Sequence, residues 1–95
     1  MLRHIVMFKL ADTSKENIEY TLGMLRSMEG KIEGMLSLEA GANFLEADRN
    51  YDIALVCEFD SLESFQKYQT HPVHMPVRAH MHKVRTASVA CDYYL

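Results

Sequence analysis

The feature of this sequence that most constrains its fold is a switch between two hydrophobic periods that occurs twice along the chain. Apolar residues at every second position indicate strands, and apolar residues three or four apart indicate helices. The first helix, for example, is indicated by Ile18, Leu22, Leu25 and Met28. Strands are predicted over residues Leu2–Leu10, Met35–Ala42, Tyr51–Phe59 and Lys83–Tyr94. The resulting order is strand, helix, strand, strand, helix, strand.

Polar residues and glycines mark the ends of the first predicted helix. Thr13 and Glu16 have the spacing of a capping box, in which each side chain accepts a hydrogen bond from the backbone of the other residue. Gly30 is predicted to end this helix, because glycine adopts the left-handed conformation that terminates helices. Residues Asn43–Asn50 are polar and are predicted to be a loop between the second and third strands.

A proline-bounded corner follows the second predicted helix. This helix is capped by Asp60-Ser61, and it is expected to end before Pro72, since a residue that precedes proline disfavours helical geometry. Residues Pro72–Met81 are predicted to form only a short helical turn, broken by Pro76.

This βαββαβ order predicts an α+β, ferredoxin-like domain: a four-stranded antiparallel sheet with its helices on one face. The 95 residues are enough for a single domain, residues 1–95. The other sheet face is predicted to carry the apolar side chains of Ile5, Met7, Ala54 and Val56. Because an exposed apolar patch usually marks an interface, a homodimer is expected, with two sheets packed face to face into an α/β barrel.

Composition excludes several other classes of protein. A net charge of −3 and the lack of a large basic patch argue against a nucleic-acid partner, and no apolar run is long enough to span a membrane. The short basic run over residues 78–85 is read as a solvated face. Cys57 and Cys91 are predicted to lie on opposite sheet faces, too far apart for a disulfide. A reducing, cytoplasmic location is expected.

Four residues form the candidate polar site. Tyr68 and His74 flank the proline-bounded corner, His4 interrupts an apolar strand face, and Asp92 lies near the end of the last strand. A carboxylate that holds one imidazole nitrogen leaves the other as a base, and a tyrosine hydroxyl can polarise a carbonyl group. These parts suit enolisation or aldol-type proton transfer. This interpretation requires the first and last strands to be neighbours.

Structural interpretations of the same residues stay open. His71 and His74 can cap the helix end, Tyr68 can be a core residue with a solvated hydroxyl, and His4 can be a hydrogen-bonded core histidine. His71 and His74 also have a spacing compatible with metal binding, but no carboxylate or cysteine lies in the same segment. No metal and no cofactor are therefore expected.

The chain resembles the stress-responsive A/B barrel (Dabb) family over nearly its whole length. The segments that carry the resemblance are His4–Leu10, Gly34 with Leu38-Glu39-Ala40-Gly41, Tyr51-Asp52, Tyr68-x-x-His71-Pro72-x-His74, and Cys91-Asp92-Tyr93. The most specific is His-Pro-x-His after a tyrosine. The resemblance implies a dimeric α/β barrel.

A polyketide cyclase of that family closes a linear polyketide by intramolecular aldol chemistry. The resemblance places its catalytic histidine at His74, its catalytic tyrosine at Tyr68, a cavity-lining histidine at His4, and an aspartate that supports the catalytic histidine at Asp92. The substrate is not implied, because Met75-Pro76-Val77 replaces a glycine-rich stretch and the chain has no tryptophan.

Two functions are compatible with these observations. The first is a cyclase-like or lyase-like acid–base catalyst, or a binder, of a small carbonyl compound, with His74 as base, Asp92 as its orienter and Tyr68 as hydrogen-bond donor. The second is a non-catalytic stress-response or interaction protein that works through its dimer surface. An open cavity that receives Tyr68 and His74 favours the first function, and a filled core with His74 in solvent favours the second.

Overall fold

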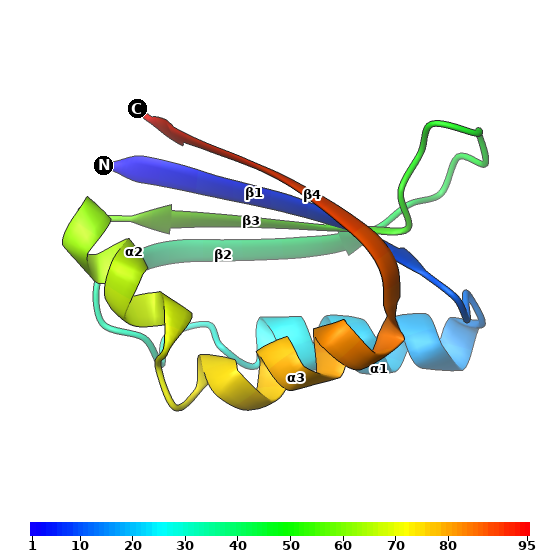
Figure 1. Cartoon of the computed structure of the whole chain (residues 1–95), viewed down its shortest axis with the longest axis horizontal. Coiled ribbons are helices and arrows are strands. Elements are labelled where there is room, and N and C mark those ends of the chain that lie inside the picture. Colours follow the sequence, from blue (N-terminus) through cyan, green and yellow to red (C-terminus); the bar gives the residue numbers. More distant parts are fainter.

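A four-stranded antiparallel sheet with three helices on one of its faces makes up the molecule (Figure 1). The computed structural model describes all residues from Met1 to Leu95. The strands are β1 (Leu2–Leu10), β2 (Met35–Ala42), β3 (Ile53–Phe59) and β4 (Arg85–Tyr94), and the helices are α1 (Lys15–Arg26), α2 (Leu62–Gln69) and α3 (His74–Val84). The predicted α+β, ferredoxin-like fold class is confirmed.

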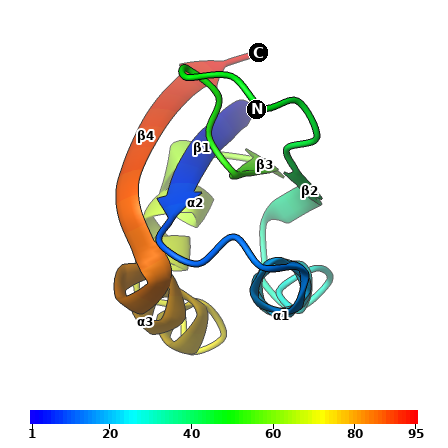
Figure 2. The same ribbon diagram turned by 90° about the vertical axis from the view of Figure 1, so that its right-hand side faces the viewer.

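The sheet has the strand order β2-β3-β1-β4, so the first and last strands are neighbours. In their antiparallel register His4 lies opposite Asp92 on one side and opposite Cys57 on the other. Figure 2 shows α1 and α3 side by side beneath the sheet, with β4 curving up from the end of α3. The core lies between these two layers and includes fully buried Met28, Cys57 and Phe59.

Helix α1 is capped by a different residue from the one predicted. Ser14, rather than Thr13, precedes the first helical residue, and its side chain accepts a hydrogen bond from the Asn17 backbone N–H. The Thr13–Glu16 capping box is therefore wrong by one position. Gly30 does not end the helix either, because α1 stops at Arg26. Gly30, with φ of 75°, lies in the turns that follow the helix.

Gly34 lies where the chain enters β2 and passes close to the start of α2. Its φ is 82°, and a Cβ atom at this position would lie 2.2 Å from the Ser64 hydroxyl oxygen. The Gly34 carbonyl also accepts a hydrogen bond from the Asp60 backbone N–H, just before the Ser61 N-cap of α2. Glycine at this position therefore lets β2 and the start of α2 approach each other.

The largest departure from the predicted elements is α3. The predicted short turn is an 11-residue helix that continues past Pro76 to Val84. Pro76 is the third residue of this helix, and backbone N–H groups in the first turn have no partner within a helix. A proline there removes no helical hydrogen bond, so the helix is not broken. As a result β4 begins at Arg85 instead of Lys83. Strand β3 also begins two residues later than predicted, at Ile53 instead of Tyr51.

The sheet face away from the helices is partly apolar and uncovered. Ile5, Ala54 and Val56 are half-buried there, while the side chain of Met7 is 39% exposed. Strand β4 adds Val89 and Cys91, which lie opposite Met7 and Ile5. The predicted separation of the cysteines is confirmed, because Cys57 is buried on the helix side, Cys91 is exposed, and both are free. None of the three helices has the length and hydrophobicity that a membrane span requires.

Candidate functional site

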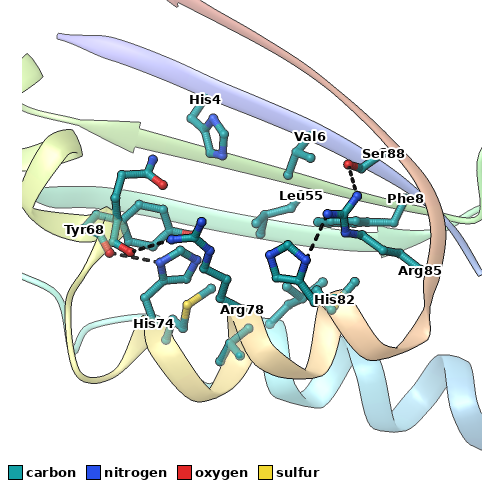
Figure 3. Close-up of a pocket in the computed structure, with 15 residues that line it drawn as sticks. His4, Val6, Phe8, Leu55, Tyr68, His74, Arg78, His82, Arg85 and Ser88 are labelled. Atoms are coloured by element: carbon teal, nitrogen blue, oxygen red, sulfur yellow. Dashed lines mark hydrogen bonds between the residues drawn. The ribbon is translucent and has the colours of Figure 1, made fainter.

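A cavity of about 290 Å³ lies between the helix-facing side of the sheet and α3 (Figure 3). Val6, Phe8 and Leu55 of β1 and β3 line it, together with Leu25 of α1 and Met28, which follows the end of α1. These side chains make one wall apolar. The volume is near the lower end of the range of about 300–1,000 Å³ that is typical of small-molecule sites.

Three of the four predicted site residues line this cavity: His4, Tyr68 and His74. The rings of Tyr68 and His74 are stacked, with centroids 4.0 Å apart and an interplanar angle of 20°. The His4 ring lies edge-on to Tyr68, at 6.3 Å between centroids. Residues from β1, the end of α2 and the start of α3 therefore meet at one end of the cavity.

Asp92 holds His4 and not His74. The Asp92 carboxylate is hydrogen-bonded to the His4 Nδ1, across the paired strands β4 and β1. The predicted meeting of an imidazole and a carboxylate from opposite ends of the chain is present. The prediction that Asp92 orients His74 is wrong, since the β4 register places Asp92 beside β1. With Nδ1 directed at Asp92, Nε2 of His4 is the free ring nitrogen.

The His74 ring is oriented by a backbone group. Its Nδ1 lies 3.0 Å from the Tyr68 carbonyl oxygen, as drawn in Figure 3. A carbonyl oxygen only accepts hydrogen bonds, so Nδ1 carries the proton and Nε2 has the free lone pair. Burial lowers the pKa of His74 below its ordinary value, and this effect outweighs the hydrogen bonds to the Tyr68 and Gln69 backbone, which raise it. The imidazole is therefore neutral at pH 7.

The Tyr68 side chain is buried, yet its hydroxyl makes no hydrogen bond to protein. The residue is 2% exposed and packs on Phe59 and Phe65 as well as on His74. No buried side-chain oxygen or nitrogen in the protein lacks a partner. The hydroxyl is consequently not sealed in the core, and it reaches the cavity that Tyr68 lines. Burial raises the pKa of Tyr68, so the hydroxyl keeps its proton and remains a donor.

His71 and His80 have structural partners outside this group. Nδ1 of His71 accepts a hydrogen bond from the Val73 backbone N–H and so caps the corner before α3. His80 lies against α1, with Nε2 3.0 Å from the Thr21 hydroxyl oxygen and its ring beside Tyr20. No three His, Cys, Asp or Glu side chains gather into a group suited to a metal ion. Burial raises the pKa of the Cys57 thiol to about 12, so it is not a nucleophile at neutral pH.

The sequence interpretation missed three basic residues of the cavity. Arg78, His82 and Arg85 all line it, whereas the sequence pattern predicts a solvated face for the run that contains them. The signal was present as His74, Arg78 and His82, spaced by four, which places three side chains on one helix face. The expectation that Pro76 breaks the helix concealed this spacing.

Comparison with known proteins identifies the family. The family model for the stress responsive A/B barrel domain matches residues 2–95. The chain belongs to the Dabb family. An uncharacterised protein of Streptomyces coelicolor is 30% identical over 77 residues, which cover 78% of this chain and 79% of that protein.

Solved structures of similar proteins agree with this assignment. A dimeric ferredoxin-like protein of unknown function from Thermobifida fusca has a TM-score of 0.89 and 29% identity, over 99% of this chain and 90% of that one. A hydroxynitrile lyase from Passiflora edulis has a TM-score of 0.84 over 99% of this chain and 92% of that one. Its identity is only 15%, so this likeness concerns the fold alone.

Proposed function

We propose that this Dabb protein binds a small enolisable carbonyl compound in the cavity and moves a proton at the carbon next to the carbonyl group. The observation that carries the proposal is the stacked pair of Tyr68 and His74. One ring presents a hydroxyl without a protein partner, and the other presents a free Nε2 on a neutral imidazole. A donor and a base side by side at a cavity with an apolar wall are the parts that enolisation needs.

The proposed step moves one proton and one electron pair. Nε2 of His74 takes the proton from the carbon next to the carbonyl group, and the electrons of that C–H bond form the enolate. The Tyr68 hydroxyl donates a hydrogen bond to the enolate oxygen, where the negative charge develops. In an aldol closure the enolate carbon then attacks a second carbonyl of the same molecule, and the imidazolium returns its proton to the new alkoxide.

His4 and Asp92 have a supporting role in this proposal. The carboxylate of Asp92 orients the His4 ring, so that Nε2 of His4 is available for a hydrogen bond to a ligand. The role is catalytic only if His4 touches the ligand. The family resemblance places the catalytic histidine and tyrosine of a polyketide cyclase at His74 and Tyr68, and this supports a carbonyl ligand.

The test is the exchange of hydrogen for deuterium next to the carbonyl group, followed by NMR in D₂O. The panel contains enolisable ketones and β-diketones, including the uncharged 4-oxo-4-phenylbutanamide. His74→Gln should slow the exchange of the responsive ketone by about 10²–10⁴-fold, the usual contribution of a general base. His71→Asn is the matched control, since an amide oxygen can replace Nδ1 of His71 as acceptor for the Val73 N–H. If no ketone exchanges faster with wild type than with His74→Gln, the acid–base role is wrong.

We also propose that two copies pack their uncovered sheet faces together. The apolar patch formed by Ile5, Met7, Ala54 and Val56 supports this assembly, as does the dimeric state of the similar Thermobifida fusca protein. We further propose a cytoplasmic location, because a reducing compartment keeps cysteines such as Cys57 and Cys91 free. A non-catalytic interaction protein would use this face and would leave the cavity without a ligand.

A further inference from the structure

A row of basic side chains runs along the cavity wall formed by α3. His74, Arg78 and His82 follow one another at intervals of four residues, and Arg85 comes directly after the helix. At a rise of about 1.5 Å per residue, His74 and His82 are separated by about 12 Å along the helix axis. Figure 3 shows this row from the stacked ring of His74 to the guanidinium of Arg85.

The positive charge of this row is not compensated within the cavity. Arg78 donates only to the Gln69 carbonyl oxygen, at 3.4 Å. Arg85 is hydrogen-bonded to the Ser88 hydroxyl oxygen at 2.9 Å and to Nδ1 of His82 at 3.0 Å, and neither partner is a carboxylate. Neither Arg78 nor Arg85 takes part in an ion pair, and none of the 15 residues that line the cavity is acidic.

Arg85 is the better placed of the two arginines to anchor an anion. It is half-buried, and its guanidinium is held from two sides by Ser88 and His82. A guanidinium that is already oriented loses little side-chain freedom on binding, and its planar fork matches the two oxygens of a carboxylate. Arg78 is exposed and lies one helical turn from His74, so it adds positive charge between Arg85 and the base.

We infer that the ligand of this cavity is a small keto acid whose carboxylate binds Arg85, while its ketone reaches Tyr68 and His74. The hydrocarbon between the two groups lies on the apolar wall formed by Val6, Phe8 and Leu55. This inference rests on the proposed function for the position of the ketone. The carboxylate site does not depend on that function, because it is argued from two arginines that have no carboxylate partner in the cavity.

The experiment compares two probes that have nearly the same shape but different charge. 4-Oxo-4-phenylbutanoate and 4-oxo-4-phenylbutanamide are titrated against the protein, and their dissociation constants are measured by calorimetry. The acid is expected to bind wild type more tightly than the amide, on the order of tenfold, as a charge-assisted hydrogen bond provides. Arg85→Gln should abolish this preference. Arg85→Lys keeps the positive charge but loses the two parallel N–H donors of the guanidinium, so it should retain part of the preference.

Lys83→Gln is the matched control, because it removes one positive charge from the exposed end of α3 without touching the cavity. It should leave the preference for the acid unchanged. Arg78→Gln should reduce the preference less than Arg85→Gln does. Equal affinities for acid and amide, a preference that survives Arg85→Gln, or no binding of the acid would each overturn the inference.

The two proposals fail separately in this design. Deuterium exchange of the uncharged amide tests His74 without any carboxylate. If exchange is independent of His74 but the acid preference depends on Arg85, the carboxylate site stands and the acid–base role is wrong. If exchange depends on His74 while acid and amide bind equally, the acid–base role stands and the carboxylate site is wrong.

Discussion

Replacing Tyr68 with phenylalanine separates the functional interpretation of this residue from the structural one. The ring is fully buried and packs on Phe59, Phe65 and His74, so it contributes to the core of the domain. The hydroxyl makes no hydrogen bond to protein and reaches the cavity. Tyr68→Phe therefore removes the proposed donor and keeps the ring.

The expected magnitudes differ for stability and for activity. A hydroxyl with a buried protein partner contributes about 0.5–1.5 kcal/mol to stability, and Tyr68 has no such partner, so Tyr68→Phe should change the free energy of unfolding by less than about 0.5 kcal/mol. Tyr68→Ala, which also removes the ring, should cost about 3–5 kcal/mol. If the hydroxyl stabilises an enolate, its loss should slow the reaction by about 10²–10³-fold.

Urea unfolding gives the stability change, and deuterium exchange of the responsive ketone gives the rate. Tyr20→Phe is the control, since Tyr20 is 61% exposed and lies outside the cavity lining. The result that refutes the reasoning is a Tyr68→Phe protein that is destabilised by more than about 1 kcal/mol and exchanges its ketone at the wild-type rate. The hydroxyl would then be a structural group.

Three further predictions concern pH, the His4–Asp92 pair and assembly. The lowered pKa of His74 means that below about pH 6.5 the unfolded chain binds more protons than the folded protein, so stability should fall as the pH is lowered from there. His74→Gln should flatten this slope in urea unfolding, and an unchanged slope would contradict it. A double-mutant cycle on His4→Gln and Asp92→Asn should give a coupling of about 1 kcal/mol, because Asp92 is partly exposed; a value near zero would contradict the pairing. Val56→Asp should convert a dimer to monomer or unfold it, and an unaltered sedimentation profile would argue against the sheet interface.

Most of the fold was predictable because local patterns and the global arrangement agree. The alternation in Leu2–Leu10 and Met35–Ala42 gave the bounds of β1 and β2 as the structure has them. Adjacent first and last strands follow from the ferredoxin-like topology, and this placed His4 and Asp92 together. Element ends were less certain, since Thr13 and Ser14 are both good N-cap residues and only the path of the chain selects Ser14.

The sequence predicted which residues form the candidate site, but it did not predict their hydrogen-bond partners. Tyr68 and His74 lie only six residues apart, so their proximity follows from one sharp corner. The partner of His4 depends on the register between β1 and β4, and the partner of His74 is a backbone carbonyl group. Neither can be deduced from the types of the side chains alone. Arg78 and Arg85 were missed because the effect of Pro76 depends on its position within the helix, and the third position tolerates it.

The most direct test of the central claim is a crystal structure of the protein with 4-oxo-4-phenylbutanoate bound. The claim predicts the ketone oxygen within hydrogen-bond distance of the Tyr68 hydroxyl, and the neighbouring carbon facing Nε2 of His74. A ligand found only on the uncovered face of the sheet, or a cavity that stays filled with water at saturating ligand, would contradict it.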